Sequence, residues 1–438
     1  MCPIILKDVV CPYCACLCDD LDVTVEGNRV TGVDNACDLA THKFQAGNRL
    51  PGPIRLTEKG WTGIGLEEAI DFTVAMLLSA DRPLIYGWST TSVEAQSLGI
   101  HIAEEIGGVI DATTSVCHGP SILAIQEVGH PGCTLGQVKN RADAVVYWGC
   151  NPIEAHPRHL SRYTTYADGF FLKNAFRERT LIVADVRKTE TANVADEFVQ
   201  LKPGGDYAVL GALRAIVRGK TDFIPAHVAG VPKAQLLRIG EICRQAKYGA
   251  FFFGMGLTQT MGKYKNIRNA IELVDELNRH TKWTLTPMRG HFNVYGFNEA
   301  CTWATGYPFA VDFSRGMAFY NPGETTAVDI LTRKECDACL VVASDPGAHF
   351  PRAAVEHLAS IPVVQIDPMV NATTAFCDLQ IPAAVTGIDA EGTAYRMDGV
   401  PIRVKKILDL GYPTDSAILG EIYRRIRDQK REREVKGV

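Results

Sequence analysis

The stretch DAVVYWGCNP at residues 143–152 decides the fold of this chain, because the stretch DACLVVASDP at residues 337–346 repeats it. Each is a short hydrophobic run that ends in Asn-Pro or Asp-Pro, which is typical of a buried strand followed by a turn. A Pro-Arg pair follows at the same offset in both, at residues 157–158 and 351–352. Such strands and turns are common in α/β proteins, but the gap-free match favours an internal duplication.

A second strand pattern follows each repeat and ends in aspartate. The runs at residues 181–185 and 362–367 end in Asp185 and Asp367. At the carboxyl ends of parallel strands, acidic residues meet ribose or base, and glycines let the backbone approach phosphate. The sequence therefore predicts two pseudo-equivalent α/β domains. Their half-sites would bind two nucleotide-bearing ligands, or one ligand between them.

A fainter repeat joins residues 84–87 to residues 251–256, where in both cases a strand meets glycine. A helix and another strand follow, and each leads to an unusual loop. The first loop contains Cys117-His118-Gly119 and the second contains Arg289-Gly290-His291. Helical spacing over 66–78 and 92–106 alternates with strand patterns, which predicts parallel sheets.

The N-terminal region crowds cysteines into a loop-rich segment. Cys11, Cys14 and Cys18 have CxxCxxxC spacing, Cys37 follows, and Cys16 lies inside the run. Thiolates bind iron–sulfur clusters and structural zinc. Zinc would favour a second CxxC pair, which is missing, so we predict a [4Fe–4S] cluster on Cys11, Cys14, Cys18 and Cys37. Cys16 is the alternative ligand, and residues 22–33 have the pattern of a small hairpin.

Composition excludes several classes of protein. The chain has 438 residues, a net charge of −5 and 14 cysteines, which argues against nucleic-acid binding and against a disulfide scaffold. Its start lacks the features of a secretory signal, and no apolar run approaches the roughly 20 residues that cross a bilayer. We therefore expect a cytoplasmic protein without membrane insertion. The charged residues at 424–434 are typical of a solvated helix or tail.

The pair Cys117-His118 and the opposite-loop residue Arg289 could carry chemistry. A thiolate suits a heavy metal, a histidine can move protons near neutral pH, and an arginine can hold a small anion. On spacing alone, three structural readings remain open. Cys117 could be inert packing, His118 could be a hydrogen-bonded core residue, and Arg289 could clamp the backbone or contact a phosphate.

Glycine-rich stretches occur at residues 202–206, 254–256 and 391–393, but neither a Walker motif nor a clean GxGxxG is present. This pattern disfavours a kinase or a simple NAD enzyme. The CxxC at residues 336–339 runs into a predicted strand, which favours core packing over a redox pair.

In combination, four segments resemble the bis(pyranopterin guanine dinucleotide) oxidoreductases, and most closely the catalytic B subunits of tungsten or molybdenum formylmethanofuran dehydrogenases. They are CPYCACLC at residues 11–18, VCHGP at 116–120, YWGCNP at 147–152 and EGTAYRMD at 391–398. The resemblance extends over essentially the whole chain. It implies an α/β fold with an N-terminal [4Fe–4S] subdomain and two pseudo-symmetric Rossmann-like domains, without the C-terminal β-barrel cap domain of the wider family.

The resemblance also implies the cofactors and their ligands. W or Mo would be bound by Cys117 and by two molybdopterin guanine dinucleotides, with His118 and Arg289 beside the metal. Lys43 would lie between the cluster and a pterin, although it could equally be a surface lysine. The residues that we expect to bind the dinucleotides are Gly149, Asn151, Pro152, Asp185, Arg187, Gly204, Asp206, Gly254, Gly256, Asp345 and Asp367, together with Lys43.

The expected domains are residues 1–55 for the cluster, residues 56–137 with 286–438 for the domain of the Cys117 loop, and residues 138–285 for the other dinucleotide domain. The implied reaction is reversible two-electron reduction of CO2 to formate. The implied partners are an amidohydrolase-type A subunit, a C subunit, a barrel-type D subunit and ferredoxin-like subunits, with a larger electron-bifurcating assembly as one option. The alternatives are another bis-pterin formate dehydrogenase and a non-catalytic iron–sulfur electron-transfer protein of the same fold.

Overall fold

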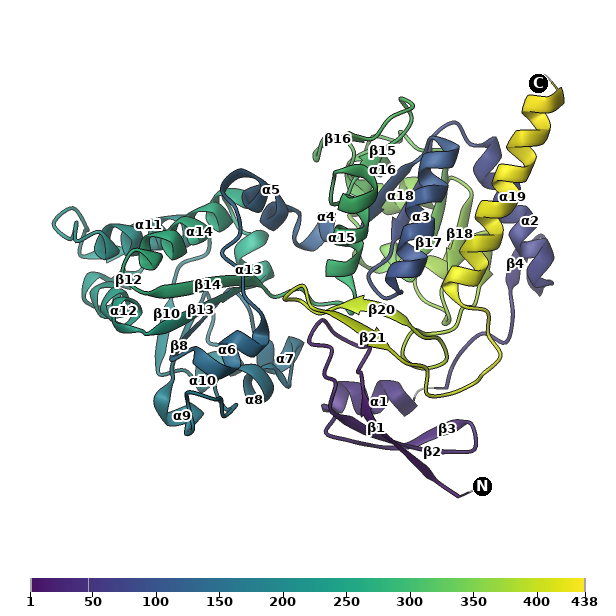
Figure 1. Cartoon of the computed structure of the whole chain (residues 1–438). Coiled ribbons are helices and arrows are strands. Elements are labelled where there is room, and N and C mark those ends of the chain that lie inside the picture. Colours follow the sequence, from purple (N-terminus) through teal and green to yellow (C-terminus); the bar gives the residue numbers. More distant parts are fainter. Residues whose placement is uncertain (1, 46, 437–438) are drawn as a thin grey trace. The chain divides into compact units, whose positions relative to one another are not determined.

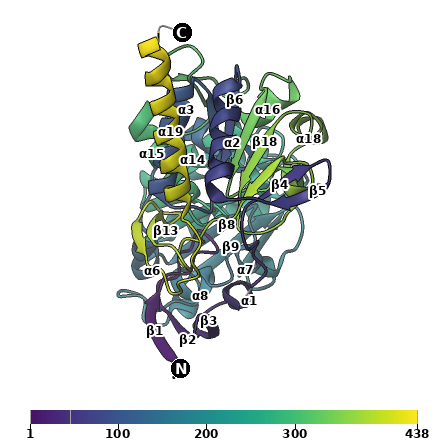
Figure 2. The same cartoon turned by 90° about the vertical axis from the view of Figure 1, so that its right-hand side faces the viewer.

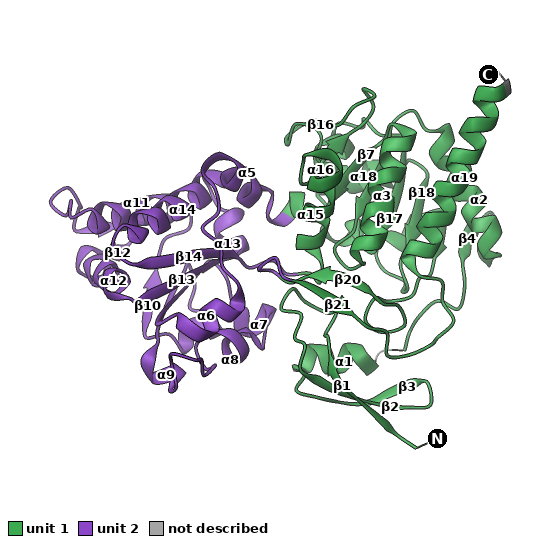
Figure 3. Ribbon diagram, in the orientation of Figure 1, with its two compact units in different colours: residues 1–116, 291–396, 401–438 green, residues 117–290, 397–400 purple. Residues whose placement is uncertain are grey.

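A computed structural model describes residues 2–45 and 47–436 as a mixed α/β protein. The chain divides into two compact units (Figure 3). Unit 1 comprises Met1–Val116, His291–Arg396 and Pro401–Val438, and unit 2 comprises Cys117–Gly290 and Met397–Val400. None of the described helices combines the length and the apolarity that a bilayer crossing requires.

Unit 2 is built on a five-stranded parallel sheet with the order β10-β9-β8-β13-β14. In chain order this is 3-2-1-4-5, the arrangement of nucleotide-binding α/β folds. Helices cover both faces (Figure 1), with α11 and α14 on one and α6 and α8 on the other. The bounds are β8 Ala144–Trp148, β9 Thr180–Asp185, β10 Glu197–Gln200, β13 Tyr248–Phe253, β14 Lys282–Pro287, α6 Leu135–Arg141, α8 His159–Tyr163, α11 Asp206–Val217, α12 Lys233–Gln245 and α14 Tyr264–Asn278.

Unit 1 contains a nine-stranded sheet whose five central strands are parallel, in the order β7-β6-β17-β18-β19. Antiparallel strands extend it at both edges. Helix α19 packs beside α3 and α2 (Figure 2), and α16 packs against α18. The bounds are β4 Ile54–Thr57, β5 Gly60–Gly63, β6 Pro83–Gly87, β7 Val109–Ala112, β15 Val311–Asp312, β16 Phe319–Tyr320, β17 Ala338–Val342, β18 Val363–Ile366, β19 Leu379–Ile381, α2 Leu66–Ser79, α3 Val93–Ile106, α16 Ala327–Thr332, α18 Arg352–Leu358 and α19 Asp415–Lys436.

The strand order confirms the internal repeat. Strands β8, β9, β10, β13 and β14 of unit 2 occupy the same sheet positions as β17, β18, β19, β6 and β7 of unit 1. The repeat sequences therefore lie on equivalent strands. In unit 1 the strands β6 and β7 come before β17, β18 and β19 in the chain. In unit 2 the equivalent strands β13 and β14 come after β8, β9 and β10. The two sheets therefore have the same strand order with different chain connections.

Backbone hydrogen bonds to side chains repeat with the strands. Asp196 Oδ2 accepts from the Leu181 N–H at 2.7 Å, and in the other sheet Asp378 Oδ2 accepts from the Val363 N–H at 2.8 Å. Asp143 and Asp337, which directly precede β8 and β17, also have matching bonds. The two carboxylate oxygens of each accept from consecutive backbone N–H groups. These shared bonds give Asp196 and Asp378, and likewise Asp143 and Asp337, the same structural role in the two sheets.

A small N-terminal part of unit 1 consists of the sheet β1-β2-β3 and helix α1. Strands β2 (Leu21–Glu26) and β3 (Arg29–Asp34) pair antiparallel, which confirms the predicted hairpin. The bounds of the other elements are β1 Ile4–Val9 and α1 Asp38–Gln45. Leu17 of the cysteine loop is fully buried in a cluster with Phe292 and Ala394, so the loop packs into the core of unit 1.

The division into units differs from the predicted domain boundaries: residues 1–55 belong to unit 1, and the segments 117–137, 286–290 and 397–400 belong to unit 2. The segment 117–137 was expected to belong with residues 56–116, but it is part of unit 2. Helix α5 (Gly119–Val128) packs on α14, and its Ala124 is buried in the core of unit 2. The apolar face of α5 thus places this segment with the other sheet.

Two smaller expectations concern Cys336 and Cys339 and the charged C-terminal residues. Both cysteines are buried in the core beside β17, in agreement with a packing role. The charged residues form the second half of α19, where Arg425 pairs with Glu421, Glu67 and Asp71. This segment is therefore a helix docked on α2 and α3 rather than a free tail.

Candidate functional site

The N-terminal cysteines lie on the loop between β1 and β2 and at the start of α1. The Cys11 N–H donates to the Cys18 carbonyl at 2.8 Å, which closes the loop, and the Leu17 N–H donates to the Cys14 carbonyl at 3.2 Å. Cys37 directly precedes α1. The fold thus brings the four predicted ligands into one region of unit 1.

The electrostatics of these thiols show how they are grouped. Burial raises the pKa of Cys11 well above its usual value, and the charges of Cys14, Cys18 and Cys37 raise it further. The pKa of the fully buried Cys16 is also raised, first by its hydrogen bond with Cys14 and then by burial. The quartet therefore shares one electrostatic environment, in which a bound cationic group would relieve the repulsion between thiolates.

No three of the described His, Cys, Asp and Glu side chains have the close arrangement that a single metal ion needs. A [4Fe–4S] cluster requires less convergence, because each cysteine binds a different iron atom. The looser grouping of Cys11, Cys14, Cys18 and Cys37 fits that requirement. Cys16 lies among them, so its position alone does not exclude it as a ligand.

Lys43, in the last turn of α1, lies next to this group. Its ammonium is 5.4 Å from the centre of the Tyr13 ring, which in turn contacts Phe44 edge to face. The hydrogen bond from Cys16 lowers the pKa of Cys14, and the charge of Lys43 acts in the same direction. Burial lowers the pKa of His291, and the charges of His349 and Lys43 lower it further. Lys43 therefore lies near both the cysteines and His291.

Cys117 is half-buried at the end of the short helix α4 (Thr114–Cys117). Its carbonyl accepts from the Thr258 hydroxyl at 2.7 Å and from Gln259 Nε2 at 3.0 Å, so the loop after β13 fixes its position. Burial raises the pKa of the free thiol to about 11, although the charge of Arg289 opposes this rise. A metal cation would be needed to hold Cys117 as a thiolate near neutral pH.

His118 is buried, and both of its ring nitrogens have partners. Nδ1 lies 3.0 Å from the Ser121 hydroxyl and Nε2 lies 3.3 Å from the Met288 carbonyl. Burial and the nearby charge of Arg289 lower its pKa to about 3, so the imidazole is neutral at physiological pH. In this arrangement His118 has the contacts of a hydrogen-bonded core histidine, and a proton transfer would require it to exchange one of them.

Arg289 follows β14 and is buried. Its charge acts on Cys117, His118 and His130, so the three predicted catalytic residues converge within unit 2. The Arg289 carbonyl accepts from His156 Nε2 at 2.8 Å. A buried guanidinium beside a thiol is suited to stabilising a small carboxylate.

His156 is a residue that the sequence did not single out. It is buried, and it positions the backbone of Arg289. It lies five residues after Asn151 in the repeat, where the second repeat has Phe350. A polar residue in place of an apolar one inside an otherwise matching repeat is the signal that could have identified it.

The predicted dinucleotide residues of unit 2 lie at the carboxyl ends of its strands, but several have structural partners. Asn151 Oδ1 accepts from the Thr191 hydroxyl at 2.7 Å, and Asp185 Oδ1 accepts from the Arg187 N–H. Pro152 opens the short helix α7 (Pro152–Ala155). These contacts shape the loops and leave the strand ends as the surface available to a ligand.

Gly204 lies just before α11, and Asp206 is the first residue of this helix. Asp206 Oδ1 accepts from Trp148 Nε1 at 2.8 Å, and burial raises the pKa of the Asp206 carboxyl. Gly204 has a φ of +77°, which favours glycine. The loop before α11 therefore combines backbone N–H groups at a helix N-terminus with a buried acid.

Gly254 and Gly256 bring two loops together. A Cβ at Gly256 would lie 2.7 Å from Gly149 Cα, and one at Gly254 would lie 2.6 Å from Cys150 Cβ. The Gly256 N–H donates to the Gly149 carbonyl at 2.9 Å. These glycines are therefore needed by packing, whether or not a phosphate also lies against them.

In unit 1, Asp345 and Asp367 take the places of Asn151 and Asp185. Asp345 Oδ1 accepts from the Thr373 hydroxyl at 2.7 Å. Burial raises the pKa of Asp367 to about 7, and the carboxylates of Asp415 and Asp345 add to this rise. This concentration of acid is suited to a ligand with several N–H donors.

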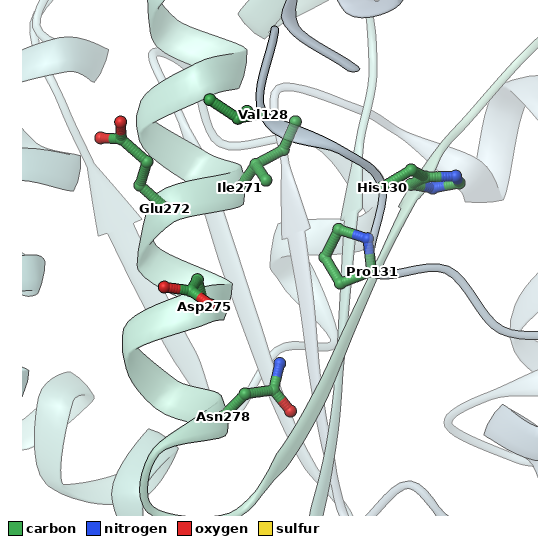
Figure 4. Close-up of a pocket in the computed structure, with 7 residues that line it drawn as sticks. All are labelled: Val128, His130, Pro131, Ile271, Glu272, Asp275 and Asn278. Atoms are coloured by element: carbon green, nitrogen blue, oxygen red, sulfur yellow. The ribbon is translucent and has the colours of Figure 1, made fainter. Parts of the chain in front are cut away.

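A pocket of about 430 Å³ in unit 2 does not involve any predicted site residue (Figure 4). It lies between α14 and the loop that follows α5. Its acid Glu272 pairs with Arg268 and Arg214. The pocket therefore offers no unpaired Glu272 carboxylate to a ligand. The residues that line it are Val128, His130, Pro131, Ile271, Glu272, Asp275 and Asn278.

The chain is 49% identical to the B subunit of the tungsten-containing formylmethanofuran dehydrogenase 2 of Methanocaldococcus jannaschii, over 97% of this chain and 99% of that protein. It is 46% identical to the B subunit of the enzyme of the same name from Methanococcus maripaludis, over 97% of this chain and all of that protein. The chain belongs to the family of formylmethanofuran dehydrogenase B subunits. No family model matches it.

A solved structure supports the fold of this family. A chain of the formyltransferase/hydrolase complex FhcABCD from Methylorubrum extorquens superposes with a TM-score of 0.70, over 84% of this chain and 98% of that chain. At 20% identity the likeness concerns the fold alone. It confirms the mixed α/β architecture, while the cluster subdomain and the missing cap domain stay predictions.

Proposed function

We propose that this chain is the redox subunit of a formylmethanofuran dehydrogenase and reversibly reduces CO2 to formate. Its near-full-length similarity to two tungsten-containing B subunits supports this assignment. The structural observation that carries it is the convergence of Cys117, His118 and Arg289, because a thiol suited to a soft metal lies beside a buried cation suited to formate.

Cys117 would bind tungsten or molybdenum together with two pyranopterin guanine dinucleotides. When bound, this group supplies the two-electron chemistry. The protein positions the substrate and stabilises the negative charge that forms on it. Reduction of CO2 takes up two electrons and one proton and produces a carboxylate, whose negative charge Arg289 would stabilise. Neutral His118 would orient the substrate through a ring N–H, or transfer the proton after exchanging its bond to Met288 or Ser121.

The dinucleotides would lie at the carboxyl ends of the two parallel sheets. In unit 2 the proposed contacts are Gly149, Asn151, Pro152, Asp185, Arg187, Gly204, Asp206, Gly254 and Gly256, and in unit 1 they are Asp345 and Asp367. The equivalence of the strands supports one dinucleotide in each unit. Lys43 would lie between the [4Fe–4S] cluster and a pterin, and Cys11, Cys14, Cys18 and Cys37 would hold that cluster as the entry point for electrons.

Like its relatives, the chain would act as one subunit of a complex, in the cytoplasm. We propose an amidohydrolase-type A subunit that condenses formate with methanofuran, a C subunit, a barrel-type D subunit that caps the pterins, and ferredoxin-like subunits that supply electrons. The likeness to a chain of the FhcABCD complex and the naming of the relatives as B subunits support membership of a multi-subunit complex. The larger electron-bifurcating assembly stays a prediction.

Metal and pterin analysis of the native complex, combined with formate oxidation by Cys117→Ala, tests this function. We expect W or Mo with two pterins per chain, and formate oxidation at least about 1,000-fold lower in the variant. A native complex that contains iron but neither W nor Mo would contradict the proposal. So would undiminished formate oxidation by the variant.

A further inference from the structure

Four aromatic side chains of unit 2 are exposed on one segment between α8 and β9. Phe170, Phe171 and Phe176 are 70%, 57% and 63% exposed, and Tyr166 is nearly half exposed. Single exposed aromatics are ordinary, but four on one short segment form an apolar patch of the kind that marks an interaction site.

This segment is held firmly, although its aromatic rings face solvent. The buried guanidinium of Arg179 donates to the carbonyls of Thr164 and Ala167, and also to those of Ala142 and Lys139. The Phe170 N–H donates to Asn140 Oδ1 at 2.9 Å. The exposure of the rings is therefore set by an ordered backbone.

The backbone beneath the rings packs closely against α6. Gly169 lies so close to α6 that a Cβ there would be 2.1 Å from the Lys139 carbonyl oxygen. The Phe170 and Phe171 rings contact each other edge to face, with centroids 4.9 Å apart. A rigid, preformed pair of aromatic rings binds a partner with little loss of conformational entropy.

The patch has a positive rim. Arg141 lies 4.5 Å from the centre of the Phe171 ring, and Lys173 lies 5.3 Å from that of Phe170. Arg177 lies on the adjacent helix α9 (Ala175–Glu178). In the part of the chain that the structure describes, no ion pair involves any of these three cations.

The nearby acids are already used by the segment itself. Asp168 Oδ1 accepts from the Ala175 N–H at 3.2 Å, and Glu178 Oε2 accepts from the Asn174 N–H at 3.0 Å. The three rim cations outnumber these two carboxylates, so the surface carries an excess of positive charge. Charge complementarity favours a negatively charged partner at this site.

We propose that this aromatic surface, made by Tyr166, Phe170, Phe171 and Phe176 with the rim Arg141, Lys173 and Arg177, is a docking site for another protein subunit. The partner would present an apolar recess for the Phe170–Phe171 pair, surrounded by Asp and Glu side chains. The inference rests on the proposed function only in taking this chain to be part of a complex. Metal binding and formate oxidation by the chain do not depend on it.

A photo-crosslinking amino acid at Phe170, introduced into the assembled complex, tests the occupant. We expect crosslinked peptides from a different subunit, at a segment rich in Asp and Glu. Crosslinks to a second copy of this chain, to lipid, or to unit 1 of the same chain would each overturn the proposal, as would the absence of any crosslink.

A double variant tests the energetics. Phe170→Ser with Phe171→Ser should weaken retention of the partner subunit at least tenfold, and Lys173→Glu should weaken it and reduce its salt dependence. Phe223→Ser is the matched control, because Phe223 is 89% exposed in the same unit but outside the surface. Equal retention by the double variant and the control would contradict the proposal. A normal thermal melt and W or Mo content would show that the variants fold and that the proposed function is intact.

Discussion

The two parallel sheets share a framework and differ in the loops that end their strands. Equivalent aspartates accept the same backbone hydrogen bonds, and the residues after β8 and β17, Gly149 and Ala343, both have a φ near +50° to +60°. The N–H groups of Trp88 and Gly254 make the same contact, to the carbonyls of Val342 and Trp148. The shared residues therefore maintain the fold.

The two sheets differ in the residues that follow β6 and β7 in unit 1 and β13 and β14 in unit 2. The N–H groups of Thr113 and Met288 donate to equivalent carbonyls, so the next residues, Thr114 and Arg289, occupy equivalent positions. Unit 1 has the buried Trp88 after β6, whereas at the equivalent position after β13 unit 2 has Gly254, against which Cys150 and the Gly149 backbone pack closely. Equivalent sheet ends are thus core packing in unit 1 and a loop that carries Arg289 in unit 2.

The largest expected effect is at Arg289. Arg289→Met should lower formate oxidation by about 10²–10³-fold, because it removes the cation that we propose to stabilise the carboxylate. Thr114→Ala at the equivalent position should cost about 1 kcal/mol of stability through its bond to Asn298, and should retain activity. Steady-state formate oxidation by the two variant complexes measures the difference. Similar activities would show that the loops are not functionally distinct.

The next effect is on stability. Trp88 is fully buried, stacks on Phe297 and fills the space beside Gly99. Trp88→Ala should destabilise the protein by about 3–5 kcal/mol, because it leaves a cavity in the core of unit 1. Thermal unfolding measures this loss, with Trp303→Ala as a control at an exposed tryptophan. An unchanged melting temperature for Trp88→Ala would contradict the packing role.

The smallest effect is a pH dependence from the acids of unit 1. Burial raises the folded-state pKa of Asp367 to about 7 and that of Asp415 to about 6. The folded state therefore binds more protons than the unfolded state, and these groups reduce stability as pH rises from about 4 through about 7. In the cofactor-free chain, Asp367→Asn should reduce the drop in melting temperature between pH 5 and pH 8.

A second variant checks the cause of that shift. Asp345→Asn removes a carboxylate that adds to the raised pKa of Asp367, so it should move the pH midpoint downward. A pH profile identical to that of the native chain in both variants would assign the dependence to other groups.

The sequence predicted the parallel strands well, because the repeats DAVVYWGCNP and DACLVVASDP combine apolar runs with matching turn chemistry. The fainter repeat also placed Cys117 and Arg289 in loops that follow equivalent strands. The two-residue strands β15 and β16, which extend the sheet beyond β7, were missed, since so short a segment has no periodicity and pairs only in tertiary context.

Two features of the site were also beyond the sequence. The placement of α5 with unit 2 depends on which sheet buries Ala124, and periodicity does not reveal that choice. The two bonds of His118 depend on Ser121 nearby and on the distant Met288 carbonyl, so only the fold shows that its imidazole is held as a neutral group.

X-ray absorption at the tungsten or molybdenum edge tests the central claim, which is that Cys117 binds the metal. The native complex should show one more sulfur ligand per metal atom than the Cys117→Ser complex. Cys133→Ser is the control, because Cys133 is half-buried in the same unit and bonds to Thr284. An equal sulfur count in the native and Cys117→Ser complexes would contradict the account.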